Sequence, residues 1–248
     1  MEPNHPTSSN DYAADISSIR QAQVRIDPFA HKTPVLTLET LDSIAGRKLY
    51  FKCECFQKGG AFKFRGACNA IYSLDDDHAA KGVVTHSSGQ GTISLELLEQ
   101  ASEIDTLIVP ISGGGLISGV VLAAKAIKPA IHIFAAEPMG ANDAFQLKIN
   151  GRIIKLSEVN TISDGLRAFL GDLTWPIVRD LMDDVIVVDD EEIIQAMRLG
   201  AIGLAAVLSN SFKTNPAYSE CNNIGIVISG GNVDLGVLSN NVNKRETL

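Results

Sequence analysis

The sequence predicts an α/β fold with a mostly parallel β-sheet. Short apolar stretches typical of strands alternate along the chain with longer stretches of helical periodicity, and this alternation indicates repeated βαβ units. The clearest unit places a buried strand at 106–111, a helix at 116–127 and a second strand at 131–136. Because a helix that joins two strands of one sheet in this way leaves them parallel, we expect the remaining strands to extend the same sheet.

Local patterns place the other elements in chain order. Residues 1–12 are rich in Pro, Ser and Asn and are expected to form a flexible tail ahead of one large domain over 13–248. Residues 49–56 alternate between two faces, which is typical of a strand, and residues 64–72 have the spacing of an amphipathic helix. Further strands are expected at 82–86, 185–188 and 224–228, and further helices at 15–30, 40–46, 92–101, 141–147, 175–182 and 191–208.

The composition is that of a globular protein without nucleic-acid or membrane partners. The chain has 248 residues, of which 45% are hydrophobic, enough to bury a sizeable core. Its net charge of −8 and pI of about 5.1 argue against nucleic acid and anionic membrane surfaces, and no apolar run has the length of a membrane span. The four cysteines lack metal-ligand spacing and are expected to be reduced thiols, which suits a cytoplasmic location. They are Cys53, Cys55, Cys68 and Cys221.

One lysine lies where the predicted strand at 49–56 gives way to the next helix. The stretch 57–66 reads Gln-Lys-Gly-Gly-Ala-Phe-Lys-Phe-Arg-Gly, so Lys63 lies between Phe62 and Phe64. Two aromatic rings can desolvate an amine and favour its neutral, nucleophilic form, which Schiff-base chemistry needs. Most lysines at a helix start are solvated charges, so spacing alone leaves both interpretations open.

A glycine-rich loop at 112–115 connects the first strand of the βαβ unit to its helix. Its glycines let backbone N–H groups approach an anion, and the helix N-terminus favours negative charge. Gly113 and Gly115 also begin a dinucleotide fingerprint, although the third glycine, Gly119, falls one position late. Glu137 ends the next strand at about the distance of a ribose-binding acid. A phosphate site, a nicotinamide-binding domain and a tight turn without a ligand therefore stay open at this point.

Two carboxylates, Glu137 and Asp143, flank a turn after the strand at 131–136. Carboxylate and carbonyl oxygens are the ligands that Mg²⁺ and Ca²⁺ prefer, but a solvated turn is the more common outcome of this spacing. His86 is expected to be a structural histidine at a strand end rather than a general base, and the acidic run 75–77 a solvated turn.

Five motifs together resemble those of the fold-type-II pyridoxal-phosphate enzymes, and most closely the family of serine racemases and serine/threonine dehydratases. The first is Gly-Gly-Ala-Phe-Lys-Phe-Arg-Gly at 59–66, which is similar to the family signature Ser/Ala-Phe-Lys-x-Arg-Gly. The resemblance runs from about His31 to Asp234 and implies a tryptophan-synthase-β-like fold. The other motifs are Thr-His-Ser-Ser-Gly at 85–89, Pro-Ile-Ser-Gly-Gly-Gly-Leu at 110–116, the acidic turn at 137–143 and Ser-Gly-Gly-Asn at 229–232.

The resemblance implies a role for each motif. Lys63 would carry pyridoxal 5′-phosphate as a Schiff base and serve one face of the substrate, and Ser88 would be the base on the opposite face. Ser229 would bond the pyridine nitrogen with a neutral hydroxyl. Glu137 and Asp143 would bind Mg²⁺ or Ca²⁺. The cofactor-binding residues would be Phe62, Lys63, Ser112, Gly113, Gly114, Gly115, Leu116 and Ser229, the third metal ligand would be the carbonyl of Ala141, and Asn232 matches a position that contacts an ATP effector in some relatives.

The activity implied by this resemblance is the interconversion of L- and D-serine, with dehydration of serine or threonine as a second outcome; serine gives pyruvate and ammonia. A homodimer is also implied. One alternative is a non-catalytic form that binds the cofactor or a full-length partner, and another is a nicotinamide-dependent oxidoreductase. The first follows from the departures described next, and the second from the near-fingerprint of the glycine loop at 112–115 and Glu137.

The chain departs from the family pattern at two places. After Ser88 and Gly89, relatives continue with an asparagine and a small domain, whereas here Gln90 follows at once. A βαβ unit takes about 30 residues or more, so the small domain is expected to be largely absent, with its junction at 74–91. A second shortening is expected near residue 199. The cofactor cleft would then lack one wall, and apolar surface would be exposed.

Overall fold

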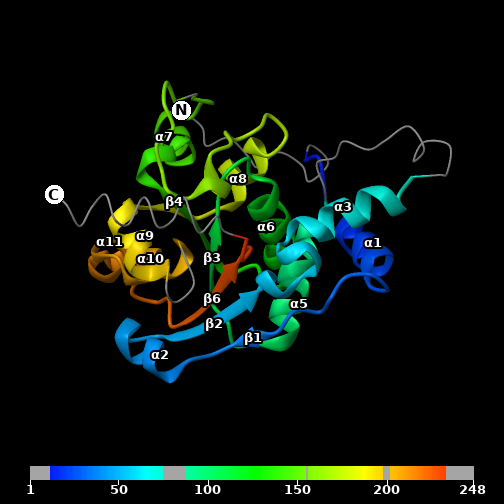
Figure 1. The fold of residues 1–248 in the computed structure, drawn as a ribbon, viewed down its shortest axis with the longest axis horizontal. Helices are drawn as coiled ribbons and strands as arrows, with labels where there is room; N and C mark the ends of the chain where they lie inside the picture. The colour runs from blue at the N-terminus through cyan, green and yellow to red at the C-terminus, as the bar shows by residue number, and fades with distance from the viewer. Residues whose placement is uncertain (1–11, 75–87, 155, 198–201, 233–248) are drawn as a thin grey trace, which may run out of the picture.

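The computed structural model describes residues 12–74, 88–154, 156–197 and 202–232, which form a sheet with helices on both faces (Figure 1). Its strands are β1 (Val35–Leu36), β2 (Lys48–Cys53), β3 (Thr106–Pro110), β4 (His132–Pro138), β5 (Asp184–Val188) and β6 (Asn223–Ile228). Their order across the sheet is β1-β2-β6-β3-β4-β5. β1 is antiparallel to β2, and every other neighbouring pair is parallel. The predicted α/β fold with a mostly parallel sheet is confirmed.

Helices cover the two faces of this sheet, and each face carries its own cluster of buried hydrophobic residues. The α-helices of the described residues are α1 (Ile16–Ile26), α2 (Glu39–Ala45), α3 (Lys63–Tyr72), α5 (Thr92–Gln100), α6 (Gly115–Ile127), α7 (Asp143–Asn150), α8 (Trp175–Leu181), α9 (Asp190–Met197), α10 (Ile202–Leu208) and α11 (Asn210–Thr214). Short 3-10 turns are η1 (Glu54–Phe56), η2 (Lys58–Gly60), η3 (Ser88–Gly91), η4 (Met139–Ala141), η5 (Asp164–Leu166) and η6 (Pro216–Tyr218).

Strand β3 shows how the two faces are filled. Leu107 and Val109 lie in the cluster formed with α5, α6 and α8, whereas Ile108 between them lies in the cluster formed with α2, α9, α10 and α11. Successive side chains of a strand point to opposite faces, so an uninterrupted apolar strand can serve both clusters. This is why the central strands read as continuous apolar runs.

Parallel strands bring their carboxyl ends to one edge of the sheet, which we call the carboxyl edge. Because β6 lies between β2 and β3, the loops that follow these three strands emerge there side by side. They are the lysine-containing stretch 57–66, the turn 229–232 and the glycine loop 112–115. Ligands of open α/β sheets commonly bind outside the carboxyl ends of the strands, so the fold alone gathers three of the predicted motifs.

The strand expected at 49–56 is shorter than predicted. β2 ends at Cys53, and residues 54–56 form the turn η1. Two side chains also break the expected alternation, because Lys52 and Glu54 are both fully buried. Both are held by ionic contacts with helices α5 and α3, described below.

The helix expected at 191–208 is described in two parts, α9 and α10, which pack on the same hydrophobic cluster on one face of the sheet. Residues 198–201 between them lie outside the described part of the chain. Helix α3 also differs from a usual amphipathic helix: Ile71 is 48% exposed and Tyr72 is 52% exposed, while Arg65 is buried.

Some predictions fall outside the described residues. These are the tail at 1–11, the acidic run 75–77, the strand at 82–86 and His86. Among the residues that the structure does describe, no helix combines the length and the apolar character that crossing a bilayer requires.

Candidate active site

Lys63 is the first residue of α3, and its loop is fastened to the turn that follows β6. The N–H of Phe62 donates to Ser229 O (2.9 Å), and the N–H of Gly231 donates to Gly60 O (3.0 Å). Gly60 has a φ of +71°, and a Cβ there would lie 2.5 Å from Oδ1 of Asn232. A glycine is therefore required at this position for both conformation and space.

The side chain of Lys63 is exposed, and its Nζ lies 5.0 Å from the centroid of the Phe62 ring. Phe64 instead lies beside a second lysine, with Lys58 Nζ 5.6 Å from its ring centroid. The expectation that both aromatics desolvate the Lys63 amine is wrong in this structure. The two rings point in different directions, so that Phe62 contacts Lys63 whereas Phe64 contacts Lys58.

The glycine loop after β3 leads directly into the N-terminus of α6. Gly114, the N-cap of this 13-residue helix, has a φ of +81° and no side chain with which to cap the first turn. The N–H groups of that turn therefore remain available to an anion, and the helix dipole favours a negative charge. Leu116 is buried at the start of the helix. This loop fits the phosphate of a cofactor.

The same loop is held in place by residues 168–174, which sequence reasoning did not single out. Ser112 Oγ donates to Ala168 O (3.0 Å) and accepts from the Ala168 N–H (2.9 Å). Thr174 Oγ1 lies 3.0 Å from Gly113 O. The Ser112 hydroxyl is thus engaged with the protein, and the loop offers an anion its backbone rather than this side chain. Nothing in the local sequence around Ala168 signals this tether.

The junction at 88–91 lies in a narrow space between helices. A Cβ on Gly89 would lie 2.4 Å from Arg65 O in α3, and one on Gly91 would lie 2.9 Å from Gly119 O in α6. Gln90 reaches the start of α6, since a Cβ on Gly115 would lie 3.9 Å from its Nε2. The backbone of Ser88 belongs to η3, but its side chain is outside the description, so its proposed position opposite Lys63 stays a prediction.

Glu137 and Asp143 form a buried acid pair at the end of β4, exposed by 1% and 2%. Glu137 accepts from the N–H groups of Ala144 and Phe145, both at 2.9 Å, and Asp143 accepts from the Leu170 N–H at 3.0 Å. Burial raises the pKa of Glu137 to about 8, against the two N–H groups that lower it. Burial also raises the pKa of Asp143.

No lysine or arginine of the described residues forms an ion pair with this acid pair. Ala141 is buried in the turn between the two carboxylates. The described residues contain no group of three or more His, Cys, Asp or Glu side chains that could hold a metal ion, so a cation here would depend on two carboxylates and backbone oxygen. Such hard oxygen ligands fit Mg²⁺ or Ca²⁺.

A second buried ionic group lies beneath α3, which we call the Arg65 cluster. It consists of Arg65, Glu54, Glu96, Lys52 and Thr33. Arg65, Lys52 and Glu54 have no exposed surface, and Glu96 is 8% exposed. Sequence reasoning missed this group because strand alternation assigns Lys52 and Glu54 to one face without indicating which distant residues they contact. Its one available signal was the presence of charged residues within otherwise apolar elements.

Comparison with known proteins places these features in one family. The model of the pyridoxal-phosphate dependent enzymes matches residues 26–91 and 88–208. The chain belongs to the pyridoxal-phosphate-dependent enzyme family. This membership favours a cofactor phosphate at the glycine loop of α6 over the dinucleotide that its near-fingerprint also suggested.

The most similar members of this enzyme family include serine racemases. The serine racemase of Arabidopsis thaliana is 51% identical over 316 aligned positions, covering 92% of this chain and 96% of that protein. The structure of maize serine racemase has 48% identity and a TM-score of 0.88, covering 95% of this chain and 99% of that one. The structure of a T.th. threonine deaminase has 31% identity and a TM-score of 0.80, covering 89% and 99%.

Two features of these matches concern the junction at 88–91. The two parts of the family match meet at 88–91. The alignment with the Arabidopsis enzyme spans 316 positions, more than the 248 residues of this chain. That relative therefore has residues for which this pyridoxal-phosphate-dependent enzyme has no counterpart.

Proposed function

We propose that this chain binds pyridoxal phosphate through Lys63 and acts on serine, with racemisation and dehydration as its two reactions. The observation that carries the proposal is the joining of the Lys63 loop to the β6 turn, beside an uncapped helix N-terminus, in a chain of this family. The named activities of the relatives, serine racemase and threonine deaminase, support the choice of substrate and reactions.

Each residue then has a defined task. Bound pyridoxal phosphate supplies an electron sink that weakens the bonds to the α-carbon of an amino acid. Lys63 Nζ holds the cofactor and moves a proton on one face, while Ser88 is proposed to hold a proton on the other. The N–H groups at Gly115 and Leu116 bind the phosphate. The neutral hydroxyl of Ser229 hydrogen-bonds to the pyridine nitrogen and does not keep that nitrogen protonated.

A second candidate is a form that binds the cofactor without turnover. The exposure of Lys63 favours it, because excluding water is part of how such a site works. The longer alignment with the Arabidopsis enzyme also supports an absent small domain with its junction at 74–91. Both candidates share the cofactor lysine, and turnover separates them.

Beyond the cofactor, we infer that Glu137, Asp143 and the Ala141 carbonyl hold Mg²⁺ or Ca²⁺. The support is two buried carboxylates without a basic partner among the described residues. The Nδ2 group of Asn232 donates to Gly59 O at 2.9 Å, so an ATP molecule at this turn would touch the Lys63 loop. The ATP contact, the homodimer and the cytoplasmic location stay predictions.

The decisive experiment compares Lys63→Ala with Lys58→Ala. Lys58 is also exposed, lies in the same loop and contacts an aromatic ring, so it is a matched control. We expect a visible absorbance band with pyridoxal phosphate, and an adduct on Lys63 after borohydride reduction and peptide mapping, in wild type and Lys58→Ala only. D-Serine and pyruvate formed from L-serine are then measured separately. An adduct on another residue, or none, would contradict the proposal; an adduct without turnover supports the second candidate.

A further inference from the structure

Arg65 lies two residues after Lys63 on α3, and its side chain points into the protein. Its guanidinium contacts both acids of the Arg65 cluster. Nε and Nη2 each donate to Glu54 at 2.8 Å, while Nη1 and Nη2 donate to Glu96 at 2.6 and 2.9 Å. Further contacts reach Thr92 Oγ1 (3.3 Å) and His31 O (3.2 Å). The planar guanidinium of arginine has N–H donors that match all of these acceptors, whereas the ammonium group of a lysine has only three donors and no planar geometry.

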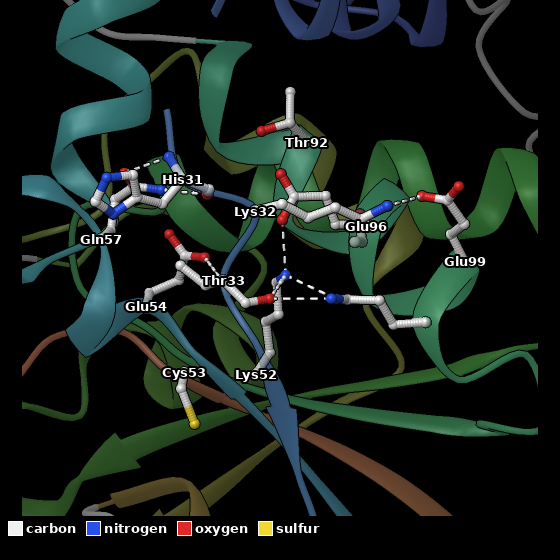
Figure 2. Close-up of polar contacts among 12 residues, drawn as sticks. His31, Lys32, Thr33, Lys52, Cys53, Glu54, Gln57, Thr92, Glu96 and Glu99 are labelled. Carbon is white, nitrogen blue, oxygen red and sulfur yellow. Dashed lines mark hydrogen bonds and ion pairs between the residues drawn. The ribbon is translucent and has the colours of Figure 1, made fainter. Parts of the chain in front are cut away.

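Lys52 and Thr33 complete the Arg65 cluster, and Lys52 supplies its second positive charge. Lys52 Nζ donates to Glu96 (2.7 Å), Thr33 O (2.8 Å) and Gln100 Oε1 (2.9 Å), so all three of its protons are used. Thr33 Oγ1 donates to Glu54 at 2.6 Å. Figure 2 shows Lys52 rising from β2 between Thr33 and Glu96. Two bases therefore face two acids, and no buried side-chain nitrogen or oxygen of the described residues lacks a partner.

Besides these contacts, the start of α3 is held through the backbone, where the N–H of Phe62 donates to Ser229 O. Phe62, which precedes the helix, makes no side-chain capping bond, and Lys63 itself is exposed. An uncapped helix end frays unless something else holds its first turn. Within that turn, Arg65 is the fully buried side chain, and its two acidic partners come from η1 and α5.

We propose that Arg65 is a positioning residue for Lys63: its double fork fixes the first turn of α3, and so aims the lysine at the carboxyl edge of the sheet. This inference rests on the proposed function, since it assumes that Lys63 carries the cofactor. The cluster is far more elaborate than anchoring one helix to a core requires. Apolar residues of similar volume commonly stabilise a fold as well as a buried ionic group does, so a demand for exact orientation explains it better.

The test compares Arg65→Lys with a control substitution on the other face of the sheet, and the loss of Tm is measured for each variant. Arg65→Lys keeps the charge and removes the fork. Phe212→Leu, in the cluster on the opposite face of the sheet, lowers stability without touching α3. Thr33→Val loosens Glu54 alone and is the milder variant should Arg65→Lys fail to fold. Amide hydrogen exchange of residues 62–66 is measured without cofactor, and pyridoxal-phosphate affinity is measured by the fraction of reduced Lys63 adduct.

We expect Arg65→Lys to speed exchange at 62–66 and to weaken cofactor affinity at least tenfold. Thr33→Val should weaken affinity about threefold, and Phe212→Leu less than twofold. Unchanged exchange, or equal affinity losses in Arg65→Lys and Phe212→Leu, overturns the inference and leaves Arg65 a stabilising residue. A wild-type chain that forms no Lys63 adduct overturns the proposed function itself, and this inference with it.

Discussion

Two pairs of buried acids in this protein have opposite surroundings. Glu54 and Glu96 face Arg65 and Lys52, and their charges are balanced within the chain. Glu137 and Asp143 are equally buried, but the donors that reach them within the described part of the chain are backbone N–H groups of three residues. An acid held only by neutral donors in a dry site is poorly compensated.

This difference in surroundings indicates a different role for each acid pair. Burial lowers the pKa of Arg65, but the hydrogen bonds to Glu54 and Glu96 outweigh it and raise the pKa overall, so Arg65 keeps its positive charge beside these two acids. The pKa of Glu137 is raised instead, which marks a carboxylate whose charge the protein does not neutralise. The Arg65 cluster is therefore balanced within the chain, whereas the acid pair is not, which is the basis for proposing that a cation binds there.

The largest effect is expected from Arg65→Met, which leaves two buried carboxylates facing one lysine. Removing one partner of a buried ion pair costs about 3–5 kcal/mol, a large share of the stability of a typical domain. Urea unfolding followed by circular dichroism measures the loss. Adding Glu54→Gln to Arg65→Met removes one uncompensated charge and leaves Lys52 with Glu96, so part of the loss should return. An additive further loss would mean that charge balance is not what the cluster provides.

The contrast between these regions also explains what the sequence could and could not predict. The glycine loop at the start of α6, the Lys63 loop before α3 and the parallel pairing of β3 with β4 depend on local patterns, and each was found where expected. The Arg65 cluster depends on contacts between positions far apart in the chain: Arg65 and Glu96 are separated by 31 residues. Alternation placed Lys52 on one face of its strand but could not show that it is buried, because periodicity carries no information about a distant partner.

Helix α3 is a second case in which the local sequence pattern did not predict which residues are buried. Its apolar spacing correctly predicted a helix, but Ile71 and Tyr72 are exposed while Arg65 is buried. A stripe of apolar residues normally faces the core. Here the charged residue takes the inner position because its partners are there. The aromatic flanks of Lys63 likewise predicted a desolvated amine, which only the three-dimensional directions of Phe62 and Phe64 could have corrected.

An intermediate effect is expected at the acid pair, and it should depend on a ligand. If Mg²⁺ binds the folded chain alone, a concentration of about 100 times Kd stabilises it by about 2.7 kcal/mol. Wild type should therefore unfold at a higher temperature in Mg²⁺, and Glu137→Gln should lose most of that response because one carboxylate is gone. Calorimetric titration gives the two affinities, with Glu99→Gln as a carboxylate control far from β4. Equal Mg²⁺ affinity in wild type and Glu137→Gln would remove the acid pair as the site.

The smallest effect is expected on the outer side of α5. Glu99 forms an ion pair with Lys32 at 2.7 Å, the same distance as Glu96 with Lys52, but the side chains of Lys32 and Glu99 are 54% and 65% exposed. Water and salt screen such a pair, and many surface pairs contribute nothing measurable. Glu99→Gln should leave the urea midpoint unchanged within error, while Glu96→Gln, on the same helix, lowers it clearly. Equal losses from the two substitutions would show that distance, rather than burial and the number of shared partners, sets the strength of these pairs.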